Sequence, residues 1–66
     1  MASDVCVRLQ LLMEEREVTQ ADLARRLGVS RTTVHQWYWG INEPNVKRLR
    51  QIRGILGCTW EELMGK

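Results

Sequence analysis

The feature that most constrains the fold is the short connection formed by Gly28, Val29 and Ser30. Gly28 can adopt the left-handed backbone conformation that ends many helices, and Ser30 is a residue type preferred as the N-cap of a following helix. Only Val29 stands between them, so we expect two helices joined by a turn of about three residues. Because the turn is this short and contains glycine, the two helices must cross at a sharp angle.

The segments on both sides of this turn have the pattern of amphipathic helices. Thr19 and Asp22, three residues apart, are a capping-box pair that begins the first helix. The second helix is expected from Arg31 to about Trp39, where Gly40 ends it. The residues expected to be buried are Leu23, Ala24 and Leu27 in the first helix, and Val34 and Trp37 in the second. A helix-turn-helix is therefore predicted over about residues 19–40.

Apolar residues at helical spacing predict three further helices. One is capped by Ser3 or Asp4 and ends near Arg16, one follows the N-cap Asn45, and a short one begins at Thr59. Their apolar residues are Val5, Leu9, Leu12 and Met13, then Val46, Leu49, Ile52 and Leu56, and last Trp60, Leu63 and Met64. We therefore expect an all-α fold, a compact five-helix domain that covers residues 1–66.

Length and composition exclude several classes of protein. With 66 residues, the chain can form one layer of helices around a core, but it has no room for an enclosed active-site cleft. It also lacks a matched set of nucleophile, base and orienting group, so we expect no enzymatic activity. We expect no metal, cofactor or small-molecule ligand. The chain shows neither a signal peptide nor an apolar run long enough to span a bilayer, which predicts a cytoplasmic protein.

The two cysteines, Cys6 and Cys58, stand far apart in apolar surroundings and outside any C-x-x-C pair. Together with a single histidine they cannot form a closed zinc site. We expect both to be reduced core residues, because free cysteine is among the most buried residue types. A disulfide between them is the alternative.

The net charge of +2 conceals an uneven distribution along the chain. Residues 20–53 contain seven basic and two acidic residues, a formal charge of +5, whereas residues 1–19 contain two basic and four acidic residues. A basic central segment is expected where one face of a protein meets a polyanion. Solvated helix faces would give the same pattern, so charge alone leaves both interpretations open.

Four polar residues lie near the start of the second helix of the helix-turn-helix. Arg31, Thr32, His35 and Gln36 follow at spacings of one, three and one, so they share one side of that helix. Arginine forms two hydrogen bonds with guanine, glutamine forms two with adenine, and the threonine methyl group packs on thymine. These residues are therefore candidates for contacts to base edges in the major groove of DNA.

A set of apolar, glycine and cap residues extends over nearly the whole chain: Leu9, Leu12, Thr19, Gln20, Leu23, Ala24, Leu27, Gly28, Val29, Ser30, Val34, Trp37, Gly40, Pro44, Leu49, Leu56, Gly57 and Leu63. In this set the chain resembles the Cro/repressor-type helix-turn-helix family of phage and bacterial regulators, also called Xre-like or lambda-repressor-like. The resemblance implies a five-helix domain that binds double-stranded DNA, at a pseudo-palindromic operator, as a homodimer.

The resemblance also implies roles for individual residues. Arg31, Thr32 and Gln36 match positions that contact bases, and His35 matches a position that contacts a base or the DNA backbone. The residues that match phosphate-contacting positions are Gln20, Thr33, Asn42, Lys47 and Arg48.

The chain departs from the family pattern at several positions. Glu17 stands where glycine is frequent, and a positive φ would strain a glutamate there. Tyr38 and Trp39 occupy positions that are usually polar. We expect Trp39, Ile41 and Trp60 to form part of a dimer contact, because large exposed apolar side chains often mark interfaces.

Two functions are consistent with the sequence. The first is a sequence-specific transcription regulator, expected to be a Cro-like repressor of phage, prophage or bacterial origin that is associated with the nucleoid. The second is a protein-interaction module, such as an antitoxin-like subunit or an adaptor, that uses exposed Tyr38 and Trp39 to bind a partner. The absence of a tail for a further domain favours the first.

Overall fold

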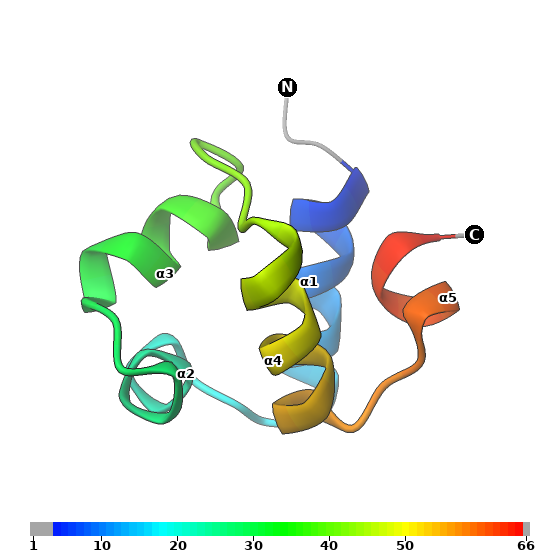
Figure 1. Ribbon diagram of the computed structural model, residues 1–66, viewed down its shortest axis with the longest axis horizontal. Helices are drawn as coiled ribbons and strands as arrows, with labels where there is room; N and C mark the ends of the chain where they lie inside the picture. The colour runs from blue at the N-terminus through cyan, green and yellow to red at the C-terminus, as the bar shows by residue number, and fades with distance from the viewer. Residues whose placement is uncertain (1–3, 66) are drawn as a thin grey trace.

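The computed structural model describes residues 4–65, and each of its helices falls where the sequence predicts one. The five helices are α1 (Asp4–Glu15), α2 (Gln20–Leu27), α3 (Arg31–Tyr38), α4 (Val46–Leu56) and α5 (Trp60–Met64) (Figure 1). No strand occurs among residues 4–65, so the prediction of an all-α, five-helix fold is confirmed. The alternative cap at Ser3 lies outside the described residues.

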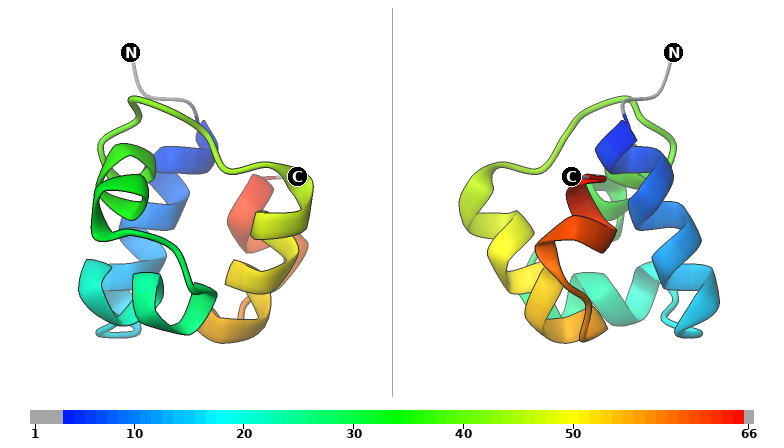
Figure 2. Two further views of the ribbon diagram at one scale, coloured as in Figure 1. Left: turned by 60° about the vertical axis from the view of Figure 1, so that its left-hand side comes forward. Right: turned by 90° about the vertical axis from the view of Figure 1, so that its right-hand side faces the viewer.

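The helices are arranged so that α3 and α5 lie on opposite sides of the molecule. α1 packs against both of them, while α2 packs against α3 and α4. Figure 1 shows α1 and α4 between the other two, and in the right-hand view of Figure 2 α5 is nearest the viewer with α3 behind. The helix-turn-helix of α2 and α3 therefore forms one end of the protein, and no other helix described over residues 4–65 covers the outer face of α3.

Every helix contributes at least one side chain to a single core. Leu9 and Met13 of α1, Leu23 of α2, Val34 of α3, Ile52 of α4 and Leu63 of α5 are fully buried. Trp37 of α3 is also buried and adds the largest side chain of the cluster. Burying a large apolar side chain contributes about 1.5–3 kcal/mol, so this core positions α3 against the rest of the fold.

The helix starts follow the predicted caps. The side-chain oxygens of Thr19, Ser30, Asn45 and Thr59 each accept a hydrogen bond from the backbone N–H three residues later, at 2.9–3.1 Å. Only the last is a complete capping box, in which Glu62 accepts from the Thr59 N–H at 2.9 Å. The predicted box at Thr19 and Asp22 is wrong in its second half, because the Asp22 carboxylate pairs with Arg25 instead.

Arg16, the residue directly after α1, connects that helix to α4 and α5. Its Nε donates to the carbonyl oxygen of Leu56 at 3.1 Å, and its Nη2 donates to Glu62 at 3.3 Å. The hydrogen bond from the Thr59 N–H, together with Arg16, lowers the pKa of Glu62 below its ordinary value, since both favour the carboxylate. A charged Glu62 is thus part of how α5 is held against α1 and α4.

The structure bears on three further points of the sequence analysis: the backbone at Glu17, the state of the two cysteines and the position of Val46. Glu17 has φ 55°, the positive value at which we expect a glutamate to be strained. Cys6 and Cys58 are both buried and no disulfide joins them, as expected for reduced core residues; burial also raises the pKa of the Cys58 thiol. Val46, which continues the apolar spacing of α4, is 66% exposed and lies outside the core. It is the first residue of α4, and helical side chains tilt toward the N-terminus, so it extends beyond the core.

None of the helices described over residues 4–65 is long and apolar enough to cross a membrane.

Candidate nucleic-acid interface

The turn between α2 and α3 sets the direction in which α3 runs. Gly28 takes the left-handed conformation with φ 71°, and its N–H bonds back to the carbonyl oxygens of Ala24 and Arg25. The Val29 N–H also bonds to the Ala24 carbonyl oxygen, at 3.0 Å, and Ser30 then caps α3. Figure 1 views α2 nearly along its axis while α3 runs across the view, so the two helices cross steeply as predicted.

The inner face of α3 is fixed by the core, which leaves its opposite face exposed. Val34 and Trp37 are buried, whereas Arg31, Thr32 and His35 are exposed and Gln36 is half-buried. The residues form two adjacent rows at a spacing of four, which brings side chains onto one helical face. Arg31, His35 and Trp39 make the first row; Thr32 and Gln36 make the second. The structure thus brings all four predicted base-contacting residues together on one outer face.

Gln20 and Thr33, both predicted to contact phosphate, lie in the first turns of α2 and α3. Gln20 is the first residue of α2, directly after its cap Thr19, and is half-buried. Helix N-termini favour anions, so this position suits a phosphate. The Thr33 hydroxyl lies 2.9 Å from the Ser30 hydroxyl, and Thr33 therefore forms part of the α3 cap.

Asn42 lies beside Gln36 rather than apart from it. Its side-chain Nδ2 donates to the Oε1 of Gln36 at 2.8 Å. The N–H groups of Ile41 and Asn42 also donate to the carbonyl oxygen of Gln36, at 2.8 and 3.3 Å. The loop after α3 therefore folds back onto the second row of the exposed face. Sequence reasoning missed this side-chain contact, because a spacing of six residues across a loop predicts no particular geometry.

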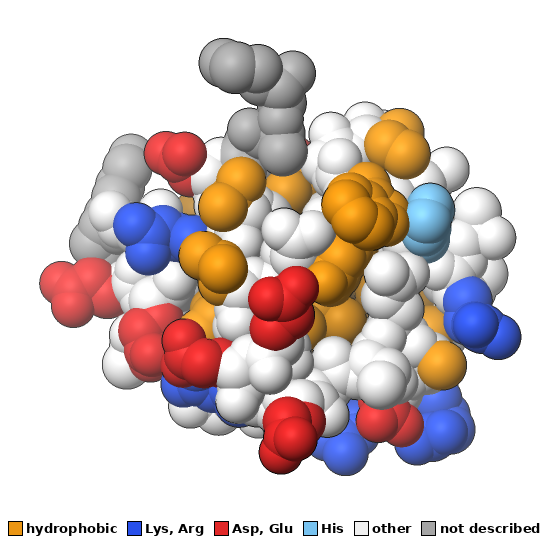
Figure 3. Space-filling model, turned by 180° about the vertical axis from the view of Figure 1, so that it is seen from behind, with side chains coloured by type: hydrophobic (Ala, Val, Ile, Leu, Met, Phe, Trp, Pro, Cys, Tyr) orange, Lys and Arg blue, Asp and Glu red, His pale blue; other side chains and the backbone are white. Residues whose placement is uncertain are grey.

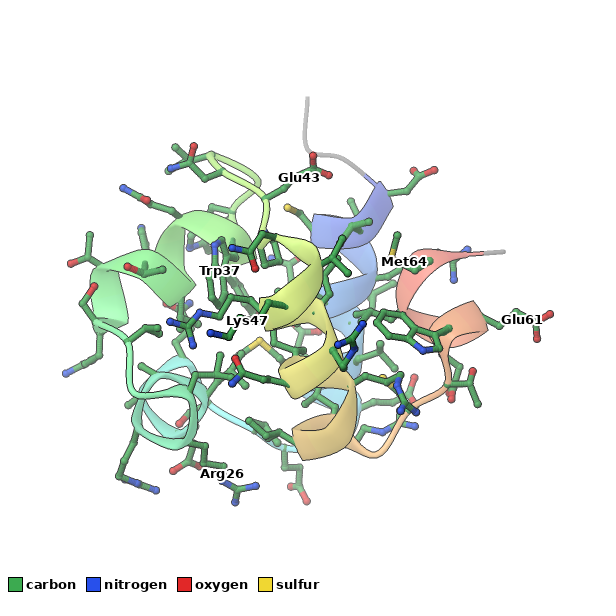
Figure 4. All side chains as sticks on the ribbon, in the orientation of Figure 1. Arg26, Trp37, Glu43, Lys47, Glu61 and Met64 are labelled. Carbon is green, nitrogen blue, oxygen red and sulfur yellow. The ribbon has the colours of Figure 1, made fainter. Side chains whose placement is uncertain are left out.

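Lys47 and Arg48, at the start of α4, have different surroundings. Lys47 is exposed, and Figure 4 labels it in the region between α3 and α4. Arg48 is half-buried; its Nη1 donates to the carbonyl oxygen of Leu27 at 3.3 Å and to Oε1 of Gln51 at 3.0 Å. Of the two, Arg48 is therefore engaged within the fold, while Lys47 is the one exposed to a ligand.

The apolar residues predicted to form a dimer contact do not share one patch. Trp39 is 57% exposed and Ile41 63% exposed, and they lie at the end of α3 and in the loop after it. Trp60 is 40% exposed at the start of α5, where the Arg53 guanidinium lies 5.3 Å from its ring centroid. Since α3 and α5 occupy opposite sides of the molecule, Trp60 lies away from the other two.

Trp39 belongs to an aromatic cluster at the edge of the exposed face of α3. Its ring meets Tyr38 edge-on at 5.2 Å between centroids, and His35 lies 6.4 Å away. The Tyr38 hydroxyl donates to Glu14 of α1 at 2.9 Å; burial and this carboxylate raise the pKa of Tyr38. Figure 3 shows hydrophobic side chains beside the histidine on the rear face. Tyr38 therefore helps to join α3 to α1, while Trp39 is left exposed.

Two further exposed apolar residues, Val7 and Leu11 of α1, were missed by the sequence interpretation. They lie four residues apart and off the buried stripe of α1, which is the signal that could have found them. Figure 3 also shows acidic side chains spread over this rear face. Acidic side chains repel a nucleic acid, which makes the α1 side a poor candidate for a nucleic-acid interface.

Comparison with known proteins places the chain in a family. The helix-turn-helix family matches residues 9–63. The HTH-type transcriptional activator BcrR of Enterococcus faecalis is 37% identical over 57 residues, which are 86% of this chain. The chain spans 28% of the length of that protein, and no solved structure matches it. With a matching family over most of its residues and a five-helix fold around α2 and α3, the chain belongs to the Cro/Xre-like helix-turn-helix family of DNA-binding domains.

Proposed function

We propose that this chain is a sequence-specific transcription regulator that binds a pseudo-palindromic operator as a dimer, with α3 in the major groove. The observation that carries the proposal is the exposed face of α3, where Arg31, Thr32, His35 and Gln36 stand together while Val34 and Trp37 hold the opposite face in the core. A helix of this kind fits the major groove with its N-terminal residues at base edges.

The residues on and around α3 have chemistry that suits these contacts. Arg31 donates through its guanidinium fork to a guanine, the Thr32 methyl group packs on a thymine, and His35 contacts a base or the backbone beside it. Phosphate contacts are assigned to Gln20, Thr33, Asn42, Lys47 and Arg48, of which Lys47 is the most exposed cation. These backbone contacts position the helix but carry no sequence information by themselves.

A dimer supplies the affinity that one recognition helix lacks. Two copies of α3 reach successive major grooves when they stand ~34–36 Å apart. We assign the contact between copies to the side that carries Trp39 and Ile41, which are exposed apolar residues next to α3. Sedimentation of wild type and Trp39→Ala on a DNA duplex tests this assignment: loss of the two-to-one complex in the variant supports it, and an unchanged complex contradicts it.

Regulation by such a protein is steric. When the dimer is bound to an operator that overlaps a promoter, it excludes polymerase from that promoter, as in Cro-like repression. The relative BcrR is named an activator, so the direction of regulation is measured by in vitro transcription from a promoter that carries the selected site. We propose a cytoplasmic protein bound to nucleoid DNA, and its place in this family favours a binding protein over an enzyme.

The experiment that tests the proposal is selection of random 20-base-pair duplexes followed by sequencing. The proposal predicts a short inverted repeat with half-site centres about 10–10.5 base pairs apart. It also predicts that Arg31→Ala loses the preference at one base pair in each half-site, while Arg8→Ala, which removes the same charge from α1, leaves the motif intact. Absence of any enriched motif with the wild-type protein would contradict it.

A second candidate function is a protein-interaction module, and the exposed Trp39 and Ile41 favour it. In that case a partner protein would cover this apolar surface, and the contacts of α3 with DNA would be dispensable. Trp39→Ala would then abolish function in cells while Arg31→Ala would leave it unchanged. The DNA-binding proposal predicts loss of function in Arg31→Ala.

A further inference from the structure

The loop after α3 makes three hydrogen bonds to one residue of the exposed face. Two backbone N–H groups, of Ile41 and Asn42, donate to the Gln36 carbonyl oxygen. The third joins two side chains, from Asn42 Nδ2 to Gln36 Oε1 at 2.8 Å. The two backbone hydrogen bonds hold the loop in place, and the side-chain amide of Asn42 therefore lies next to the side chain of Gln36.

This side-chain bond determines which end of the Gln36 amide is free. A glutamine amide has one carbonyl oxygen that accepts and one NH₂ group that donates. Because the oxygen accepts from Asn42, the NH₂ group, with its two hydrogens, is the part of the amide left to donate to a ligand. Gln36 therefore faces outward as a donor.

The two purines differ in what they require from such a group. The usual two-bond contact of glutamine with adenine needs both ends of the amide, since the oxygen accepts from N6 while the nitrogen donates to N7. The contact with Asn42 occupies one of the two lone pairs of that oxygen and turns it toward the loop, which disfavours a second bond from N6. Guanine presents two acceptors, O6 and N7, and needs only donors. An amide held in the orientation of Gln36 thus matches guanine better than adenine.

We propose that Asn42 is a positioning residue that fixes the Gln36 amide with its NH₂ group outward, so that the pair selects guanine rather than adenine. This inference rests on the proposed function, because it specifies the base contacted by the second row of α3. It also assigns Asn42 a role beyond phosphate binding, although its second Nδ2 hydrogen stays available for a phosphate.

The base pair concerned can be located in the operator. Gln36 lies five residues after Arg31, which is about 7.5 Å along the helix axis at the α-helical rise. Successive base pairs are separated by about 3.4 Å. The guanine selected by Gln36 therefore falls about two base pairs from the one contacted by Arg31.

The test is selection of random duplexes with wild type, Gln36→Ala, Asn42→Ala and the control Glu43→Ala. Glu43 is exposed in the same loop, and Figure 4 labels it away from α3. The position whose preference disappears in Gln36→Ala should be guanine with wild type and with Glu43→Ala. In Asn42→Ala the guanine-to-adenine ratio there should fall about two- to tenfold, the factor expected for one neutral hydrogen bond.

A second variant reverses the orientation instead of releasing it. In Asn42→Asp the carboxylate can only accept, so the Gln36 NH₂ must turn toward it and the oxygen must turn outward. The preferred base at the same position should then carry an amino group, adenine or cytosine. The added negative charge weakens binding to all duplexes alike, and the preference is compared within each selection. Thermal melting of each variant confirms that it is folded.

The outcomes separate the two levels of the argument. The positioning role is overturned if wild type selects adenine at the Gln36 position. It is also overturned if both Asn42 variants keep the base preference of wild type at that position. In either case sequence-specific binding stands. If wild type selects no motif at all, the proposed function fails and this inference with it.

Discussion

The guanidinium of Arg48 donates to the carbonyl oxygen of Leu27 across 3.3 Å and so joins the first turn of α4 to the last residue of α2. The last carbonyl groups of a helix have no partner within the helix and need one from elsewhere. Arg48 supplies it directly before the Gly28 turn. The orientation of the helix-turn-helix relative to α4 therefore depends on Arg48, a residue for which we also propose a phosphate contact.

Arg48 and its neighbour Lys47 should consequently respond differently to removal. Arg48→Ala should destabilise the fold by about 1 kcal/mol, because a part-buried carbonyl loses a charged donor. Lys47→Ala should change stability by less than about 0.5 kcal/mol, since this side chain is exposed. It should instead weaken binding to all duplexes and, because the proposed dimer loses one phosphate contact per subunit, reduce the slope of log affinity against log salt by about 2. Urea unfolding and salt titrations of both variants check this; equal losses of stability would contradict the account.

The hydrophobic core is tested by comparing the stability of two leucine-to-alanine variants, one at a buried leucine and one at an exposed leucine. Leu23→Ala should cost about 2–5 kcal/mol, because Leu23 is fully buried between α2 and the other helices. Leu11→Ala, the same substitution on a residue that is 54% exposed, should cost less than about 1 kcal/mol. Thermal and urea unfolding measure both. Comparable losses in the two variants would mean that the core is not the one described.

The backbone is strained at Glu17, in the turn after α1, so we expect a substitution that relieves this strain to stabilise the fold. Glu17 holds φ 55°, a conformation that is unfavourable for residues with a Cβ and free of that cost for glycine. Glu17→Gly should stabilise the fold by up to about 1 kcal/mol, after the greater freedom of glycine in the unfolded chain is deducted. The midpoint of thermal unfolding should rise, and a lower midpoint would refute the assignment of strain to this residue.

Acid sensitivity should come in part from Glu62. Its pKa is lowered in the folded protein by the Thr59 N–H and by Arg16, so its contribution to stability is complete above the ordinary carboxyl pKa of 4.5. That contribution is lost as the pH falls through the lowered value. Glu62→Ala should therefore be less stable at pH 7 and should lose less stability than wild type between pH 5 and pH 2.

The matched control for this experiment is Glu61→Ala. Glu61 is exposed in the same turn of α5, and Figure 4 labels it pointing away from the other helices. Unfolding midpoints across the acid range should keep the wild-type pH dependence in this variant. If Glu61→Ala flattens the profile as much as Glu62→Ala, the capping box and Arg16 are not its cause.

The sequence predicted those parts of the fold that depend on neighbouring residues. The caps at Ser30, Asn45 and Thr59 act over three residues, and the turn at Gly28 depends on one glycine, so local chemistry determines them. The buried face of α3 was predicted because a period of 3.6 residues separates Val34 and Trp37 from the polar residues.

The parts that the sequence did not predict depend on how distant elements meet. Val46 continues the apolar spacing of α4, but it is 66% exposed because no element described over residues 4–65 covers the start of that helix. Trp39 and Trp60 look alike as exposed aromatics, yet the packing of α1 with α3 and with α5 separates them. The bond between Asn42 and Gln36 depends on the path of a loop and on two rotamers, neither of which follows from residue spacing.

The most direct test of the account is the affinity of wild type, Arg31→Ala and Arg8→Ala for the selected duplex and for a scrambled duplex at one salt concentration. The account predicts that Arg31→Ala loses about 1–3 kcal/mol per half-site on the selected duplex and much less on the scrambled one, because in each half-site a base contact is lost in addition to a charge. Arg8→Ala should bind both duplexes as wild type does. Equal weakening on the two duplexes by Arg31→Ala, or no weakening on either, would contradict the assignment of α3 as the helix that contacts bases.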